Sequence, residues 1–101
     1  MDLETKPAAF KRGVPKAQLN GLFGLEEHLM ANDADEVVCI VRYRVEDVIS
    51  KEKKGERYPV VETVHIEPLR DPEEIGAALK LLRAAYSSRT GEAQLDLGEI
   101  A

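Results

Sequence analysis

The chain has 101 residues, of which 19 are acidic and 14 basic, so its formal net charge is -5; 44% of its residues are hydrophobic and one is a cysteine. This length indicates one small domain, and the longest apolar stretch, 37–41, is far shorter than the roughly 18 residues of a membrane helix. Because the first 15 residues contain no apolar run typical of a secretory signal, we expect a cytoplasmic protein. We expect Cys39 to be a small buried side chain in a reducing compartment.

Residues 1–14 contain scattered charges, Pro7 and Gly13, without a periodic pattern, which predicts a flexible N-terminal arm. A helix is predicted from Pro15 onward. Its apolar stripe would be formed by Leu19, Leu22, Leu25 and Leu29. Glycines at 21 and 24 each cost about 1 kcal/mol relative to alanine inside a helix, so we expect this helix to be broken or to begin later.

Two stretches rich in β-branched residues, 36–49 and 58–69, flank a turn at 53–56, and this pattern predicts a long antiparallel β-hairpin. A two-residue loop of Lys54 and Gly55 would gather the apolar residues on one face. On the polar face, this register places Arg42 opposite Glu67 and Arg44 opposite His65. On the apolar face, it places Asp47 opposite Glu62.

A second helix begins at Asp71, an acidic N-cap followed by Pro72 at the first helical position. Gly91 provides the left-handed C-cap. The helix face that we expect to be buried carries Ile75, Leu79, Leu82 and Tyr86. In residues 92–101, leucines alternate with polar residues and glycine, a pattern typical of a short strand or an extended tail.

These elements predict an α+β fold made of a helix, a long antiparallel β-hairpin, a helix and a short C-terminal strand or tail. The predicted organisation is an arm at 1–14, a single α-β-β-α domain at 15–91 and a tail at 92–101. An isolated two-stranded hairpin is marginally stable and leaves its edges unpaired. We therefore expect either a homodimer, with 36–69 contributing to the interface, or a tail that adds a third strand.

The sequence contains no phosphate-binding glycine loop, no Cys-x-x-Cys or His-Glu-x-x-His spacing and no serine in a nucleophile-elbow context. Since no nucleophile, base and orienting group can be assembled, we expect no enzyme activity, no cofactor and no metal. The facing carboxylates Asp47 and Glu62 could bind a cation or share a proton. We favour the alternative that both are simply solvated near the tip of the hairpin.

Basic residues gather at the hairpin tip and on the polar face, where a β-ribbon could approach nucleic-acid phosphates. These residues are Arg42, Arg44, Lys51, Lys53, Lys54 and Arg57. Acidic residues are interleaved among them and the net charge is negative, which disfavours long-range attraction to DNA. We therefore favour a solvated, salt-bridged face and keep nucleic-acid binding as the alternative function.

The C-terminal segment Gln94, Leu95, Asp96 and Leu97 resembles the peptide by which bacterial replication and repair proteins bind the sliding clamp. By that resemblance, Gln94 would form hydrogen bonds at the rim and Leu97 would fill the hydrophobic pocket. Gly98 stands where the peptide has a phenylalanine, and aromatic anchors usually carry much of such an interface. The alternative, which we favour, is that Leu95 and Leu97 pack in a terminal strand.

The order of elements and the segment Leu-Leu-Arg-Ala-Ala-Tyr at 81–86 resemble small early proteins of phages that infect actinobacteria. Such families commonly lie among replication and recombination genes, and the resemblance implies no site residues. The leading hypothesis is a non-catalytic module, homodimeric, that binds a host or phage protein in the bacterial cytoplasm. Nucleic-acid binding through the hairpin tip and a role as a virion assembly component are the alternatives.

Overall fold

The computed structural model describes residues 2–91. The chain divides into two compact units, the first formed by Met1–Asp35 and Val41–Glu67 and the second by Glu36–Ile40 and Pro68–Ala101. The first unit holds most of a β-sheet and the second holds one long helix. The expected single domain at 15–91 stays a prediction. No helix within residues 2–91 is long and apolar enough to cross a membrane.

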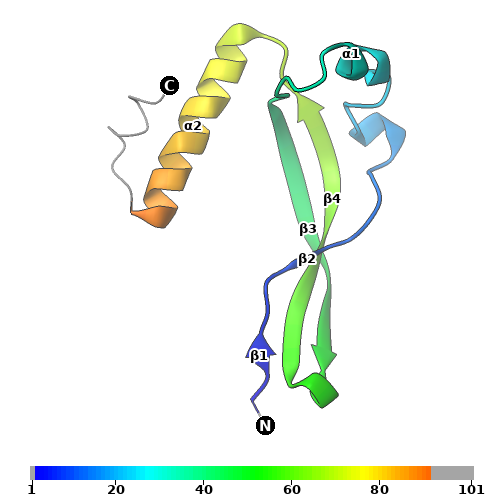
Figure 1. Cartoon of the computed structure of the whole chain (residues 1–101), viewed down its shortest axis with the longest axis vertical. Helices are drawn as coiled ribbons and strands as arrows, with labels where there is room; N and C mark the ends of the chain where they lie inside the picture. Colours follow the sequence, from blue (N-terminus) through cyan, green and yellow to red (C-terminus); the bar gives the residue numbers. More distant parts are fainter. Residues whose placement is uncertain (1, 92–101) are drawn as a thin grey trace. The chain divides into compact units, whose positions relative to one another are not determined.

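The sheet is mixed and has four strands (Figure 1). They are β1 (Glu4–Thr5), β2 (Ala9–Phe10), β3 (Cys39–Lys51) and β4 (Glu56–Pro68). Strands β1 and β2 both pair with β4 in parallel, with Glu4 beside Glu56 and Ala9 beside Val60. Strand β3 also pairs with β4. Strand β4 is therefore the centre of the sheet.

The predicted fold, a long antiparallel β-hairpin between two helices, is wrong. The structure has a mixed sheet in which the ordered triple β1-β4-β2 is parallel. Residues 1–14, expected to be a flexible arm without packed elements, supply β1 and β2. The physical reason is the backbone of β4, whose hydrogen-bonding groups need partners on both edges. Amides of the N-terminal segment donate to the carbonyl of Gly55, just before this strand, and to two carbonyls within it: Glu4 to Gly55, Lys6 to Arg57 and Lys11 to Val61, at 2.7–2.9 Å.

The connection between β3 and β4 is longer than the predicted two-residue loop. A 3-10 turn, η2 (Glu52–Lys54), is followed by Gly55 in the left-handed conformation, with φ 66° and ψ 34°. The amide of Gly55 donates to the carbonyl of Glu52 at 3.0 Å. Glycine adopts this conformation without a Cβ penalty, so the turn ends here and β4 begins at Glu56.

Strand β4 is irregular between Val61 and Ile66. The carbonyls of both residues accept hydrogen bonds from the N-terminal segment, from Lys11 and Gly21 respectively, each at 2.8 Å. In a regular strand, groups that point to one edge recur at every second residue, but these two residues are an odd number apart. If β4 contains one extra residue between them, as in a β-bulge, both carbonyls can point to the same edge. The predicted register assumed a regular strand and could not include this shift.

The expected break in the first helix is confirmed. A short 3-10 turn, η1 (Ala17–Leu19), is separated from α1 (Glu26–Ala31) by residues that include Gly24. Gly24 has φ +93°, a conformation that right-handed helices do not contain. The leucines that were predicted to share one stripe therefore lie on separate elements.

Helix α2 (Pro72–Thr90) begins and ends as predicted. The Asp71 carboxylate accepts a hydrogen bond from the amide of Glu73 at 2.9 Å, and Pro72 occupies the first turn. Gly91 closes the helix in the left-handed conformation, with φ 78°. These are local interactions between residues close in sequence, and each stabilises a helix end independently of the surrounding fold.

The predicted burial of one face of α2 is met only in part. Ile75 and Leu79 are half-buried, but Leu82, expected at the centre of this face, is 64% exposed, and Tyr86 is 37% exposed. Among the described residues, no hydrophobic side chain is buried, and Ser87 is the one buried side chain. No other described segment covers Leu82, so residues 2–91 present apolar surface where the sequence predicted a core.

Candidate functional site

The second unit contains an open groove of about 580 Å³ beside helix α2. One side is formed by the chain before and within the start of β3, and the other by α2. The lining side chains are Val38, Cys39, Ile40, Leu69, Glu74, Ala77, Ala78, Leu79, Leu81, Leu82 and Ala85. All but Glu74 are apolar or weakly polar, so the groove can bind an apolar ligand and offers one negative charge.

A backbone hydrogen bond joins the chain before β3 to the chain after β4 at this groove. The amide of Leu69 donates to the carbonyl of Val38 at 2.9 Å. Cys39, the next residue after Val38, is free and half-buried. Burial raises the pKa of the Cys39 thiol, and a protonated thiol is a weak nucleophile. Cys39 therefore contributes apolar surface to the groove, as expected from the sequence, although it is not fully buried.

A second apolar surface lies along β3. Almost every residue of this strand is exposed, whereas most residues of β4 are half-buried. The exposed apolar residues of the strand are Ile40, Val41, Tyr43, Val45 and Val48. The Tyr43 ring meets the Phe10 ring of β2 edge to face, with centroids 5.8 Å apart. Apart from this contact, the strand offers a long and largely uncovered surface.

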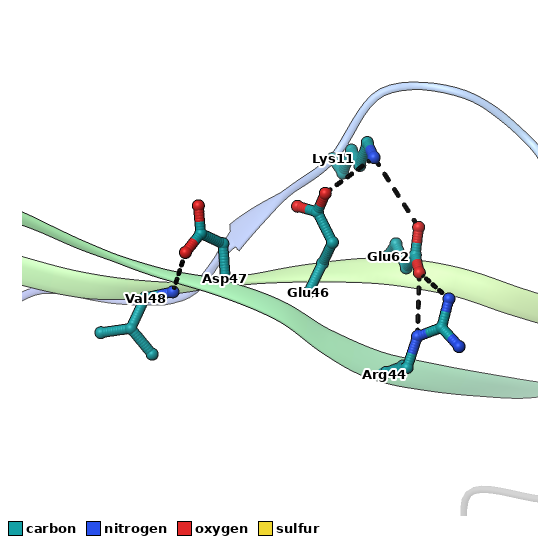
Figure 2. A network of polar contacts seen from close by, with 6 residues as sticks. All are labelled: Lys11, Arg44, Glu46, Asp47, Val48 and Glu62. Carbon is teal, nitrogen blue, oxygen red and sulfur yellow. Dashed lines mark hydrogen bonds and ion pairs between the residues drawn. The ribbon is translucent and has the colours of Figure 1, made fainter.

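A cluster of four charged side chains crosses the first unit (Figure 2). Lys11, which follows β2, donates to Glu46 of β3 at 2.9 Å and lies 3.8 Å from Glu62 of β4. Arg44 of β3 forms an ion pair with the same Glu62. Two cations and two anions alternate, so the cluster joins three strands and carries no net formal charge.

The pKa values of this cluster follow from these contacts. The hydrogen bond from Arg44 lowers the pKa of Glu62, and the charges of Arg44 and Lys11 act in the same direction. The hydrogen bond to Glu46 raises the pKa of Lys11. Each shift favours the charged form, as expected when opposite charges lie close together. The contacts therefore favour the charged forms of Lys11 and Glu62 and link β3, β4 and the segment after β2.

The predicted juxtaposition of Asp47 and Glu62 is wrong. Glu62 binds Arg44 and Lys11 instead, while the Asp47 carboxylate accepts a hydrogen bond from the amide of Val48 at 2.8 Å (Figure 2). Two facing carboxylates would repel each other. Glu62 instead lies beside two cations, Arg44 and Lys11. These two carboxylates therefore do not form the cation or proton-sharing site that we weighed.

The other polar contacts across β3 and β4 also differ from the predicted register. Arg42 Nη2 lies 3.5 Å from His65 Nδ1, and His65 Nε2 lies 2.8 Å from a carboxylate oxygen of Glu67. The sequence predicted Arg42 opposite Glu67 and Arg44 opposite His65. In the structure, His65 stands between Arg42 and Glu67, and Arg44 pairs with Glu62.

The remaining basic residues of the nucleic-acid hypothesis lie around the turn between β3 and β4. Lys51, Lys53 and Lys54 line a shallow hollow together with Ser50 and Glu52. The Lys51 ammonium lies 5.8 Å from the centroid of the Tyr58 ring. Arg57 is exposed on β4. Thus the structure groups Lys51, Lys53 and Lys54, while Arg42 and Arg44 have partners elsewhere on the sheet.

The predicted clamp-binding residues Gln94, Leu95, Asp96 and Leu97 lie outside the described residues, so the choice between a strand and a docking peptide stays open. Sequence reasoning missed Lys11 and the groove. The partners of Lys11 depend on the pairing of β2 with β4, for which a two-residue strand gives no sequence pattern. The groove had a signal, the apolar residues of α2, but these were assigned to a core.

Within residues 2–91, no group of three histidine, cysteine, aspartate or glutamate side chains could hold a metal ion. Comparisons of the chain with protein-family models, curated proteins and solved structures find no match. The resemblance to phage early proteins therefore stays a hypothesis, and the geometry alone supports a functional proposal.

Proposed function

We propose that this chain is a non-catalytic protein-interaction module that acts as a homodimer and binds a further protein through the groove beside α2. The observation that carries the proposal is the exposure of its apolar residues. No hydrophobic side chain among the described residues is buried, while Leu81, Leu82 and the apolar residues of β3 are exposed. Exposed apolar patches typically mark binding sites.

The groove beside α2 fits an apolar helical segment of a partner protein. Along α2, small residues alternate with leucines: Ala77 and Ala78 precede Leu81 and Leu82, and Ala85 follows. Small side chains let another backbone approach, and leucines pack against its apolar stripe in the helix-in-groove mode. Glu74 is the charged residue of the lining, so the partner segment should place a lysine or arginine near it.

The test is affinity capture from a bacterial lysate after nuclease treatment, using the wild-type chain and two variants. Leu82→Asp places a charge in the groove, and Lys80→Asp places the same charge at an exposed position that does not line it. We expect the wild-type chain and Lys80→Asp to recover the same protein, and Leu82→Asp to lose it. The captured protein must then bind the purified chain in isolation through an apolar helix.

Loss of capture with Lys80→Asp alone, or capture that Leu82→Asp leaves unchanged, would contradict the groove as the binding site. Circular dichroism of the three proteins must show equal helix content, because a loss of capture by an unfolded variant proves nothing. A partner segment without a basic residue would contradict the role given to Glu74.

Nucleic-acid binding through the turn between β3 and β4 is the second candidate. The observation that favours it is that no ion pair within the described part of the chain involves Lys51, Lys53 or Lys54. Phosphate binding weakens steeply as salt rises, whereas apolar docking responds little. Titration of the chain with labelled DNA and RNA duplexes at 50 and 200 mM salt distinguishes the two candidates. An affinity that falls as salt rises supports nucleic-acid binding, and no measurable affinity contradicts it.

The proposal places the protein in the cytoplasm, which is the host cytoplasm if the chain comes from a phage. An accessory role in replication or recombination follows only from the resemblance to phage early proteins. The sliding clamp is a candidate partner through Gln94 and Leu97, and a role as a virion assembly component is a further alternative. Identification of the captured protein separates these hypotheses.

A further inference from the structure

Strand β3 has one edge without a partner among the described residues. It pairs with β4, whose other edge is occupied by β1 and β2. The open edge is long, because β3 extends from Cys39 to Lys51. A strand edge of this kind is a template for another strand, since its amides and carbonyls lack hydrogen-bond partners within the sheet.

Natural edge strands usually carry features that prevent such pairing, such as prolines, bulges or charged side chains, especially lysines. Strand β3 contains no proline and no glycine, and its one lysine, Lys51, is its last residue. Its central segment does carry four charged residues, Arg42, Arg44, Glu46 and Asp47. Two are basic and two are acidic, so these charges prevent some registers of pairing and favour others.

The backbone direction shows which residues face the open edge. The carbonyl of Val38, next to the start of β3, accepts the amide of Leu69 and therefore points toward the β4 side. Backbone groups alternate between the two edges of a strand. Tyr43, Val45 and Asp47 consequently direct their amides and carbonyls to the open edge, whereas Arg44 and Glu46 direct theirs toward β4.

A second copy of the chain can pair with this edge by two-fold symmetry, which makes the two β3 strands antiparallel. A register centred near either end of β3 would pair only a few residues of each strand, so the central residues 43–47 are the ones to compare. Among these, Tyr43, Val45 and Asp47 bring outward-facing backbone groups together at the axis as a hydrogen-bonded pair. A register centred on Asp47 places two carboxylates opposite each other. A register centred on Tyr43 places Arg42 opposite Arg44. Like charges directly opposite each other destabilise a strand pair.

Symmetry also permits an axis through a pair without direct hydrogen bonds, centred on Arg44 or Glu46. Such a register would place Arg44 opposite its own copy or Glu46 opposite its own copy. Both arrangements bring like charges together. The register centred on Val45 differs from all of these, because it places Arg44 opposite Glu46 on both sides of the axis and valine opposite valine at the centre.

We propose that β3 pairs with β3 of a second copy of this chain, antiparallel and centred on Val45, so that Arg44 of each copy faces Glu46 of the other. This inference rests on the proposed homodimer and names its interface. The sheet then continues through the dimer, from β4 of one copy to β4 of the other. The charge cluster of Lys11, Arg44, Glu46 and Glu62 (Figure 2) becomes part of a network across the axis.

A single cysteine tests the register. In a hydrogen-bonded antiparallel pair, the two Cα atoms are about 5.5 Å apart, within the range of about 4.4–6.8 Å that disulfides span. In a Cys39→Ser background of the full chain, Val45→Cys should therefore form a disulfide-linked dimer under mild oxidation. We expect the crosslinked dimer to be the main species on a non-reducing gel, because the geometry suits a disulfide.

Val48→Cys in the same background is the matched control. Val48 is 61% exposed and Val45 is 59% exposed, so both thiols are equally accessible. Two residues at position 48 lie about 20 Å apart in the proposed register, because each is three residues from the axis. Val48→Cys should therefore remain uncrosslinked under conditions in which Val45→Cys is crosslinked.

A charge substitution provides the second measurement. Arg44→Glu places glutamate opposite Glu46 of the other copy and should raise the dimer dissociation constant at least tenfold by light scattering or sedimentation. Arg42→Glu makes the same change of charge at a position that faces the uncharged Val48 of the other copy, and should change the dissociation constant much less. Equal dissociation constants for the two variants would contradict the register.

The outcomes separate this inference from the proposed function. A wild-type dimer in which Val45→Cys fails to crosslink, or in which Val48→Cys crosslinks equally well, overturns the register and leaves the homodimer standing. A monomer mass at micromolar concentration overturns both the register and the homodimer. Crosslinking at Val45 alone, together with weaker association of Arg44→Glu than of Arg42→Glu, supports the interface.

Discussion

Glu62 illustrates how the position of one residue depends on its strand neighbours. The alternation of residues along β4 predicts that Glu62 lies on the apolar face, but in the structure it has two cationic partners, Arg44 and Lys11. The irregularity between Val61 and Ile66 changes which side chains it meets. The alternation of apolar and polar residues along β4 can be seen in the sequence. The irregularity of the strand cannot, because it depends on how two separate segments pair with the same edge of β4.

The first prediction concerns the pH dependence of Glu62. Because its pKa is lowered in the folded protein, its ionised form stabilises the fold above the glutamate pKa of the unfolded chain, about 4.3. This contribution is lost as the pH falls through the lowered pKa. Glu62→Gln should reduce stability at pH 7 and make the fall in stability below about pH 5 shallower. Urea denaturation between pH 3 and 7 measures both effects.

Asp47→Asn is the matched control, since Asp47 forms no ion pair within residues 2–91. The free energy of unfolding of the Asp47→Asn variant should change with pH more nearly as that of the wild-type chain does. If Glu62→Gln and the wild-type chain lost stability equally between pH 5 and 3, the Arg44 and Lys11 contacts would not contribute to the fold.

At the scale of elements, the accuracy of sequence interpretation follows the range of the interactions. Asp71, Pro72 and Gly91 determine the ends of α2 through contacts within a few residues, and both ends were predicted correctly. Gly24 likewise breaks the first helix through its own conformation. Strands β1 and β2 have two residues each, too few for a periodic pattern. They form because their backbones pair with an edge of β4.

The second prediction compares one substitution at two glycines of α2. Gly76 lies inside the helix, where an added Cβ atom would meet nothing within 4 Å beyond the helix's own backbone, whereas Gly91 has φ +78°. Gly76→Ala should stabilise the protein by about 1 kcal/mol through helix propensity. Gly91→Ala should destabilise it by about 1–2 kcal/mol through left-handed strain. Thermal and urea unfolding measure the two shifts, and shifts of the same sign would contradict the assigned backbone of α2.

The third prediction concerns Leu82. A buried leucine replaced by alanine typically costs about 2–5 kcal/mol, but Leu82 is 64% exposed in the groove. Leu82→Ala should therefore change the free energy of unfolding by less than about 1 kcal/mol, an amount typical of surface substitutions. Lys80→Ala is the control at an exposed position. A loss of several kcal/mol in the Leu82 variant would show that another part of the chain covers this face.

At the scale of the whole molecule, composition alone misleads about burial. A chain with 44% hydrophobic residues predicts a core, and the spacing along α2 predicts which face would enter it. The spacing of apolar residues does not determine which chain covers that face. The described residues bury no hydrophobic side chain, and the proposed function assigns this apolar pattern to contacts with another chain. The candidate groove could be predicted only as an apolar face, without its function.

The last prediction tests this interpretation through concentration. If folding is coupled to dimer formation, the free energy of unfolding should rise with protein concentration, by about 1.4 kcal/mol per dimer for each tenfold increase. Urea unfolding of the full chain from 1 to 100 μM should show this rise as a higher midpoint. Val45→Asp places two carboxylates opposite each other at the proposed axis and should remove the dependence. A wild-type midpoint that stays constant over this range would mean that one chain folds alone and that its exposed apolar surface serves a different partner.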